Sequence, residues 1–251
     1  PLYEEGEFLL RIELREPRNY SLILRSIAHG NHTLGEICSY AGMDKSMVSK
    51  YVDVLMSLEL IKPEIPFGAS VKFKRRLYWI SDPYLSFWFR FVLPNKSEIE
   101  GSHMADLNEK FLSDFEVYAG EQFERLMKNL VADGIMGRTF DNVARWWGRN
   151  KSKRSGEDIE EIDIVAHSEG RNELLFAECK WTAKPVSVTI VNRLKLKSKQ
   201  LLEQYPESTV TYAVFSKSGF TGNINEIKDE AVLMDLNDME KILFQNVERS
   251  K

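Results

Sequence analysis

The stretch EEIDIVAHSEGRNELLFAECKW, residues 160–181, decides the fold expected for the C-terminal part of this chain. Two apolar runs, Ile162 to Ala166 and Leu174 to Ala177, flank a polar turn that contains Gly170 and Asn172. Apolar runs separated by such a turn predict a β-hairpin with a loop of several residues. The second run is apolar on both faces, which is typical of a central strand rather than an amphipathic edge strand.

The hairpin carries ionisable side chains in an apolar setting. Asp163 lies in the first strand, and Glu178 and Lys180 close the second on one face, because alternate strand residues share a face. Two carboxylates and a lysine at this spacing are the layout of a phosphodiesterase site in which oxygen ligands hold Mg²⁺. The competing interpretation is that these charges only mark where a strand emerges into solvent. Charges at the end of a central strand nevertheless need a reason.

Composition narrows the class of protein. The chain has 251 residues, 43% hydrophobic and 29% charged, with a formal net charge of −4, which is typical of a soluble globular protein with room for two domains. No apolar run approaches the roughly 20 residues of a membrane span, and the acidic start does not resemble a signal peptide. Cys38 and Cys179 are far apart and form no CxxC pair, which argues against a disulfide framework or a zinc site. We expect a reducing, cytoplasmic compartment and no membrane association.

The N-terminal part predicts a winged helix over residues 19–81, after an arm at residues 1–18. Helical periodicity starts at Asn19, Thr33 and Glu36 form a capping-box pattern, and Asp44 or Ser46 caps a third helix. Helix, short helix, glycine turn and longer helix is the helix-turn-helix order. Residues 61–66 and 71–80 are expected to supply the two strands of the wing.

Positive charge is concentrated on the third helix and the wing of this unit. Residues 45–76 contain seven basic and three acidic side chains, a pattern that favours contact with double-stranded DNA. The alternatives are a protein-docking module or a solvated basic surface. The residues expected to contact the duplex are Ser46, Ser49 and Lys50 on the helix and Lys72, Lys74, Arg75 and Arg76 on the wing.

The rest of the chain predicts an α/β domain with a mixed central sheet over residues 105–251. Residues 82–104 are expected to form a buried helix and a linker. The helix starts at Pro83 and is apolar all round, and the linker covers residues 96–102. The sequence GSHM at 101–104 also matches a common tag-removal scar. A long amphipathic helix, a strand at 139–148 and a basic loop at 149–154 precede the hairpin. A helix at 187–205, a strand at 209–215, a short helix, a short strand and a terminal helix follow it. Lys197 and Lys199 of the first of these helices are expected to hold DNA phosphates.

Two resemblances follow from these residues. Glu124, Asp163, Glu178 and Lys180, in a helix-strand-strand-helix-strand order, resemble the PD-(D/E)XK restriction-endonuclease superfamily, with Ile162-Asp163 in place of Pro-Asp. Residues 19–55 and 81–95 resemble the winged helix and following helix of the archaeal-type ATPase family, and GEQFERL at 120–126 resembles a motif of its restriction-endonuclease-like C-terminal domain. This last motif favours Glu124 over Glu121. The family places a P-loop ATPase domain upstream, but this chain has no GxxxxGK[ST] motif.

The resemblance implies a metal-dependent DNA endonuclease directed by its winged helix. Asp163, Glu178, Glu124 and the carbonyl of Cys179 would bind Mg²⁺ or Mn²⁺, and Lys180 would position the attacking water. The alternative is a non-catalytic DNA-binding or regulatory module of an archaeal-type ATPase, in which the nuclease-like domain is an inactive scaffold. A P-loop ATPase domain, upstream or separate, is the other expected partner.

Overall fold

The described part of the chain divides into two compact units. The computed structural model describes residues 17–100, 108–149, 159–227 and 229–249. The first unit holds the residues up to Ile65 together with Ala69–Asp114, and the second holds Pro66–Gly68 together with the residues from Phe115 onward. The expected boundaries after residues 18, 81 and 104 stay predictions. The arm at residues 1–16, the GSHM sequence at 101–104 and residues 150–154 of the basic loop lie outside the described residues.

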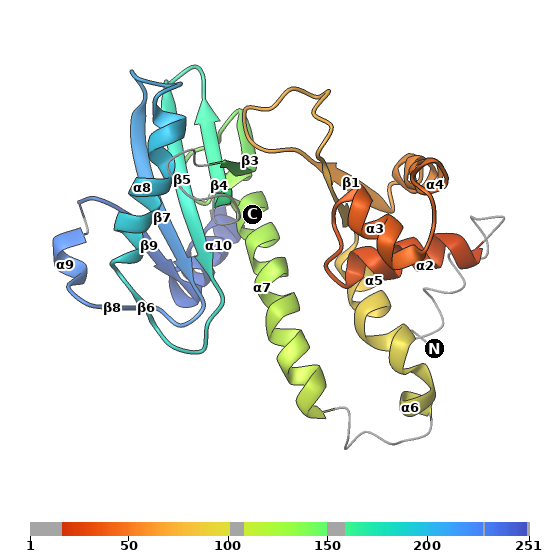
Figure 1. The fold of residues 1–251 in the computed structure, drawn as a ribbon. Coiled ribbons are helices and arrows are strands. Elements are labelled where there is room, and N and C mark those ends of the chain that lie inside the picture. The colour runs from red at the N-terminus through yellow and green to blue at the C-terminus, as the bar shows by residue number, and fades with distance from the viewer. Residues whose placement is uncertain (1–16, 101–107, 150–158, 228, 250–251) are drawn as a thin grey trace. The chain divides into compact units, whose positions relative to one another are not determined.

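The first unit has a winged-helix-like arrangement (Figure 1). Its elements in chain order are α2 (Pro17–Ala28), α3 (Leu34–Ala41), α4 (Lys45–Ser57), β1 (Ile61–Glu64) and β2 (Leu77–Ile80). The predicted capping box of α3 is confirmed, since Thr33 N donates to Glu36 Oε2 at 2.8 Å and Glu36 N donates to Thr33 Oγ1 at 3.2 Å. Gly42 ends α3 with φ at 63°, a left-handed conformation that glycine adopts at little cost. Asp44, rather than Ser46, caps α4.

The strands of the hairpin in this unit are shorter than predicted. β1 ends at Glu64 and β2 begins at Leu77, whereas the sequence predicted strands over 61–66 and 71–80. Pro66 has no N–H to donate to a ladder. Arg76 donates from Nε to Phe73 O at 3.1 Å and from Nη2 to Val71 O at 2.6 Å, so side-chain bonds close the loop where ladder bonds were expected.

The apolar helix after the hairpin continues further than predicted. It passes from α5 (Pro83–Phe87) through a π-helical turn at Trp88–Val92 and a 3-10 turn at Leu93–Asn95 into α6 (Lys96–Glu100). The linker predicted at 96–102 is therefore wrong for residues 96–100. Pro94 is tolerated because it stands in the first turn of the 3-10 segment, where its missing N–H is not needed. The predicted cap at Asp82 is confirmed by a 2.9 Å hydrogen bond from Leu85 N.

The second unit contains a mixed five-stranded sheet in the order β3-β4-β5-β7-β9. β3, β4 and β5 are antiparallel neighbours, and β5, β7 and β9 are parallel neighbours, so the predicted hairpin and mixed sheet are confirmed. The strands of this sheet are β3 (Asn142–Arg149), β4 (Ile159–Ser168), β5 (Glu173–Lys180), β7 (Thr209–Ser216) and β9 (Val232–Asp235). The other elements are α7 (Asn108–Ala132), which begins in the first unit, β6 (Val186–Ser187), α8 (Ile190–Leu202), β8 (Phe220–Thr221), α9 (Ile224–Ile227) and α10 (Leu236–Arg249).

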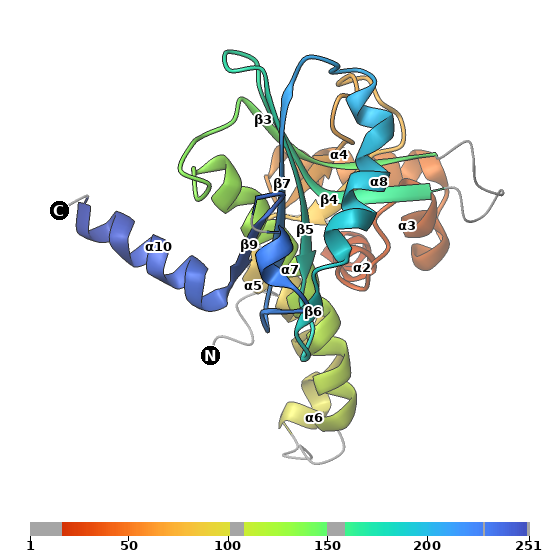
Figure 2. The same ribbon diagram turned by 90° about the vertical axis from the view of Figure 1, so that its left-hand side faces the viewer.

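Helices cover both faces of this sheet (Figures 1 and 2). On one face Phe123 and Met127 of α7 pack with Leu175 and Ala177 of β5, and Met239 of α10 joins them. On the other face Leu194 and Leu201 of α8 pack with Leu174 and Phe176 of β5. β5 is therefore buried on both sides, as its continuous apolar run predicted.

Candidate functional site

The ionisable residues of the hairpin meet where β4 leaves β5. The antiparallel ladder between these strands ends at the pair Ile164↔Ala177, so Glu178 and Lys180 extend beyond it. The carboxylate of Asp163 accepts a 2.8 Å hydrogen bond from Cys179 N at Oδ2. Beyond the last ladder pair, a side-chain oxygen of β4 therefore accepts the hydrogen bond that a backbone carbonyl of β4 would otherwise accept. This bond holds Asp163 beside the end of β5.

A β-bulge in β4 includes Asp163. β3 and β4 pair at Ala144↔Val165 and at Trp146↔Ile162, so two residues of β4, Asp163 and Ile164, oppose the single residue Arg145. In a regular strand, residues two apart share a face. Here Ile162 belongs to the core beneath α8 and Ile164 to the core beneath α7, because the bulge interrupts this alternation.

Lys180 bridges the two carboxylates of the hairpin. Its Nζ donates to Glu178 Oε2 at 2.6 Å and to the carbonyl oxygen of Cys179 at 3.0 Å, and it lies 3.5 Å from Asp163 Oδ2. The predicted shared face of Glu178 and Lys180 is confirmed by these contacts. Only 5% of the Glu178 side chain and 10% of the Asp163 side chain are exposed, so both carboxylates depend on nearby cations.

Two further basic residues complete the cluster. Arg145 Nη2 donates to Glu124 Oε2 at 2.7 Å and lies 3.7 Å from Glu161 Oε2. Lys197 Nζ donates to Glu178 Oε1 at 2.5 Å. The sequence had predicted a DNA phosphate as the partner of Lys197, because Lys197 lies on a basic helix. Sequence reasoning missed Arg145, although a charged residue between Ala144 and Trp146 of a strand was an available signal.

The environment moves the pKa values of these carboxyl groups in opposite directions. Burial and the neighbouring charge of Glu178 raise the pKa of Asp163 above its ordinary value. Burial also acts to raise the pKa of Glu178, but Lys180 and Lys197 outweigh burial and lower it. Burial, followed by repulsion from Asp163, raises the pKa of Glu124 to about 7, although Arg145 opposes this change. Pairs of carboxyl groups whose pKa values are pushed apart are common at catalytic sites.

Lys180 keeps its proton at neutral pH. Burial alone lowers the pKa of an ammonium group, but the negative charges of Asp163 and Glu178 outweigh burial and raise the pKa of Lys180 to about 12. In this arrangement Lys180 can donate hydrogen bonds and stabilise negative charge, and it cannot accept a proton.

The donor chemistry of the cluster fits a hard divalent cation. Asp163, Glu178 and the carbonyl of Cys179 present oxygen atoms, which Mg²⁺ and Mn²⁺ prefer. The Cys179 thiol is not a comparable ligand, because burial raises its pKa well above the ordinary value. Within the described residues no three His, Cys, Asp or Glu side chains are grouped as a ready-made metal site. The ammonium groups of Lys180 and Lys197 lie on the carboxylate oxygens that a cation would need.

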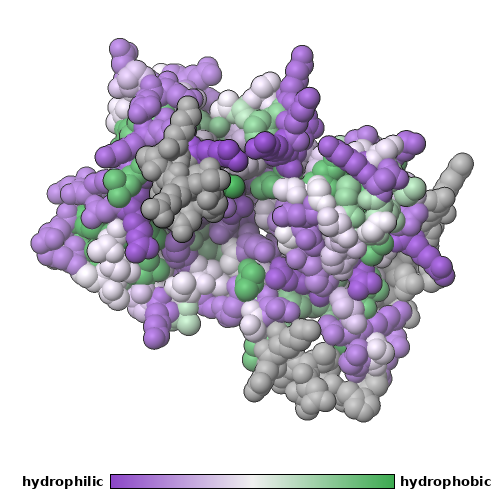
Figure 3. All heavy atoms as spheres, in the orientation of Figure 1, coloured by the Kyte–Doolittle hydropathy of each residue, from purple (hydrophilic) through white to green (hydrophobic). Residues whose placement is uncertain are grey.

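The residues predicted to contact DNA lie mainly on the exposed surface of the first unit. Ser46 and Lys50 of α4 are exposed, and so are Lys72, Lys74 and Arg75 in the loop between β1 and β2. Two of the predicted contacts differ, because Ser49 is half-buried and Arg76 binds backbone carbonyls of its own loop. In the second unit Lys199 is exposed on α8. The face drawn in Figure 3 is mainly hydrophilic, with hydrophobic atoms in scattered areas.

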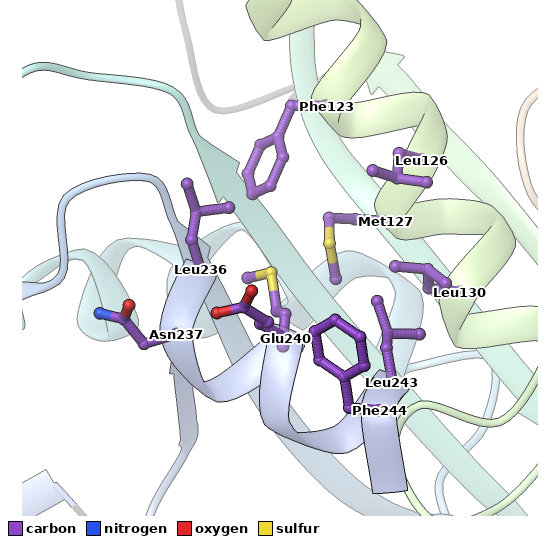
Figure 4. Close-up of a pocket in the computed structure, with 10 residues that line it drawn as sticks. Phe123, Leu126, Met127, Leu130, Leu236, Asn237, Glu240, Leu243 and Phe244 are labelled. Atoms are coloured by element: carbon purple, nitrogen blue, oxygen red, sulfur yellow. The ribbon is translucent and has the colours of Figure 1, made fainter. Parts of the chain in front are cut away.

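An apolar groove of about 490 Å³ lies between α7 and α10 (Figure 4). Leu126, Met127 and Leu130 of α7 face Leu243 and Phe244 of α10 across it. The groove shares no lining residue with the acidic cluster.

Comparison with known proteins gives partial matches. Residues 88–199 match the DUF234 family. This family is described as archaea bacterial proteins of unknown function. An uncharacterized protein of Methanocaldococcus jannaschii is 36% identical over 181 residues, which cover 70% of this chain and 39% of that protein. The chain therefore spans about two fifths of the length of this relative.

Among the similar solved structures, two MarR proteins cover about half of the chain or less. A zinc-responsive MarR family member of Lactococcus lactis has a TM-score of 0.25 and 18% identity, covering 42% of this chain and 74% of that one. Staphylococcus aureus MarR in complex with salicylate and kanamycin has a TM-score of 0.28 and 22% identity, covering 50% and 85%. At these TM-scores the likeness says nothing further about this chain.

In the described parts of the chain, no helix combines the length and apolar character that a membrane crossing requires.

Proposed function

We propose that the second unit hydrolyses phosphodiester bonds of DNA with the help of Mg²⁺ or Mn²⁺. The observation that carries this proposal is the convergence of Asp163, Glu178 and Lys180 at the end of a buried central strand. Burying two carboxylates beside each other is costly, and a fold gains little stability from such a cluster alone. The order of elements and the residues Glu124, Asp163, Glu178 and Lys180 also resemble the restriction-endonuclease superfamily.

Each residue has a distinct role in this proposal. Asp163, Glu178, Glu124 and the carbonyl of Cys179 would hold the cation, which would supply water activation and offset charge on the phosphate. Lys180 donates hydrogen bonds toward the attacking water or the phosphate and stays protonated, in keeping with its raised pKa. The buried side chains of β5 exclude bulk water from one side of the cluster, which strengthens each electrostatic contact within it.

The first unit supplies duplex binding in this proposal. Lys50 of α4 and Lys72, Lys74 and Arg75 of the following loop are exposed and offer cationic contacts to phosphates. Arg76 is assigned to the support of that loop instead, because its guanidinium already binds two backbone carbonyls. On the basis of the family resemblance alone, we also propose that a P-loop ATPase domain acts together with these two units.

A second function is a DNA-binding or regulatory module without catalytic activity. The observation in its favour is that Lys180 and Lys197 both contact Glu178, so an internal cation engages each oxygen of this carboxylate. A cluster that is neutralised in this way could serve as a structural ion-pair network. The two functions differ in whether a divalent cation can displace these ammonium groups.

The test is cleavage of supercoiled, linear and single-stranded DNA by the purified chain in Mg²⁺ and in Mn²⁺. We expect cleavage that depends on the cation and that is abolished in Lys180→Ala, with duplex affinity little changed. Lys184→Ala is the matched control, because Lys184 is an exposed lysine four residues further along the chain. A folded wild-type protein that binds duplex but cuts no substrate in either cation would favour the non-catalytic module.

A further inference from the structure

Basic side chains hold the carboxylates of the cluster from three different elements. Arg145 of β3 binds Glu124, Lys180 of β5 lies between Asp163 and Glu178, and Lys197 of α8 binds the second oxygen of Glu178. With Glu161, which lies 3.7 Å from Arg145, four carboxylates face three basic groups. The acidic half of this arrangement was predictable from the hairpin, whereas the pairing with Arg145 and Lys197 was not.

Arg145 and Lys197 reach the cluster from its borders. Their side chains are 18% and 31% exposed, so both are partly accessible to solvent. The bulge places Asp163 and Ile164 opposite Arg145 in the β3–β4 ladder. A divalent cation that takes the carboxylate oxygens adds two positive charges to this cluster. Lys197 then loses Glu178, and Arg145 loses Glu124 but keeps Glu161 nearby, so a phosphate can compete for both basic groups.

We propose that Arg145 and Lys197 are phosphate-binding residues that the carboxylates hold in the metal-free protein and release when a divalent cation binds. This inference rests on the proposed function and adds a regulatory step to it. The cation and the duplex then bind cooperatively, because each favours the arrangement in which the basic groups have left the carboxylates. Thermodynamic linkage requires this effect to be reciprocal, so duplex also tightens cation binding.

A structural role for the same ion pairs makes a different prediction. If Lys197 only neutralises a buried carboxylate, its removal leaves Glu178 with one cation fewer and destabilises the fold. The effect of a divalent cation on duplex affinity would then be the same with and without Lys197. Duplex binding with and without cation therefore separates the two roles.

The experiment measures the affinity of the full chain for a fluorescently labelled duplex by anisotropy, in EDTA and in Ca²⁺. Electrophoresis of the recovered duplex verifies that it is intact. For the wild type we expect Ca²⁺ to tighten binding on the order of tenfold, within the usual range of coupling between sites. For Lys197→Met we expect Ca²⁺ to tighten duplex binding by less than about threefold. Arg145→Met should also reduce this effect of Ca²⁺ below that of the wild type.

Lys195→Met is the matched control for the loss of one positive charge. Lys195 stands on the same helix but pairs with Glu230 outside the cluster. Its variant should keep the wild-type gain in affinity with Ca²⁺. Thermal unfolding of each variant verifies that the fold is retained, and Lys197→Arg, which keeps the charge, should restore most of the coupling.

Calorimetric titration of Ca²⁺ in the absence of DNA completes the test. Lys197→Met should bind Ca²⁺ at least as tightly as the wild type, because a competing internal cation has been removed. A wild-type gain in duplex affinity that persists in both Lys197→Met and Arg145→Met would overturn this inference while leaving the nuclease proposal intact. A wild-type protein that binds no divalent cation at all would overturn both.

Discussion

Glu124→Gln tests the electrostatics of the cluster through the pH dependence of folding. Burial and repulsion from Asp163 raise the pKa of Glu124 from 4.5 to about 7, so the folded state holds a proton that the unfolded state releases. Stability from this group is therefore complete below about pH 4.5 and is lost as the pH rises toward 7. Glutamine cannot titrate, so the variant should not show this loss.

The size of the effect follows from the change in pKa and from solvent exposure. A rise from 4.5 to about 7 corresponds to about 3 kcal/mol, at about 1.4 kcal/mol for each pKa unit. The Glu124 side chain is 32% exposed, and solvent screening reduces the contribution of such a group. We expect the wild type to lose about 1–2 kcal/mol of unfolding free energy relative to Glu124→Gln between pH 4.5 and pH 7.

Urea denaturation of both proteins at several pH values, in EDTA, measures this difference. Tryptophan fluorescence follows the transition, since Trp146, Trp147 and Trp181 all lie in the second unit. Glu116→Gln removes an exposed carboxylate from the same helix and controls for the loss of one negative charge. A wild type that loses no unfolding free energy relative to Glu124→Gln as the pH rises from 4.5 to 7 would refute the reasoning.

Three further variants test the fold and the duplex surface. Phe176→Ala removes a fully buried ring between the sheet and α8 and should cost about 3–5 kcal/mol in chemical denaturation, whereas a cost below about 1 kcal/mol would contradict the packing. Thr33→Ala removes the capping box of α3 and should cost about 1 kcal/mol in the same assay; an unchanged denaturation midpoint would contradict this. The double variant Lys74→Ala and Arg75→Ala should weaken duplex binding and reduce the slope of log affinity against log salt by about 1 for each lost phosphate contact. An unchanged slope would show that the loop does not contact duplex.

Local signals in the sequence were sufficient for the hairpin and the helix caps. The apolar run Leu174 to Ala177 identified β5 as a central strand because burial on both faces leaves no room for polar side chains. Thr33 and Glu36 identified the start of α3 because a capping box depends only on residues three apart. These features are set by neighbours in the chain, so no tertiary information was needed.

The bulge and the ion pairs of the cluster depend on contacts between distant segments. Asp163 and Ile164 oppose Arg145 only once β3 and β4 have paired, and the sequence of β4 alone does not show that one extra residue is accommodated there. Lys197 was assigned to a phosphate because its helix is basic, whereas the packing of α8 against β5 brings its ammonium to Glu178. The shortening of β1 and β2 likewise depends on the hydrogen bonds of Arg76 within the loop. The cytoplasmic location stays a prediction.

Calorimetric titration of Mn²⁺ into the wild type and into Asp163→Asn is the most direct test of whether the acidic cluster holds a divalent cation. Asparagine keeps an oxygen that can accept the hydrogen bond from Cys179 N, so the variant should retain the local fold. We predict saturable Mn²⁺ binding by the wild type that is lost or weakened at least about tenfold in Asp163→Asn, equivalent to about 1.4 kcal/mol. Equal Mn²⁺ binding by both folded proteins, or none by the wild type, would contradict a metal-dependent function of this cluster.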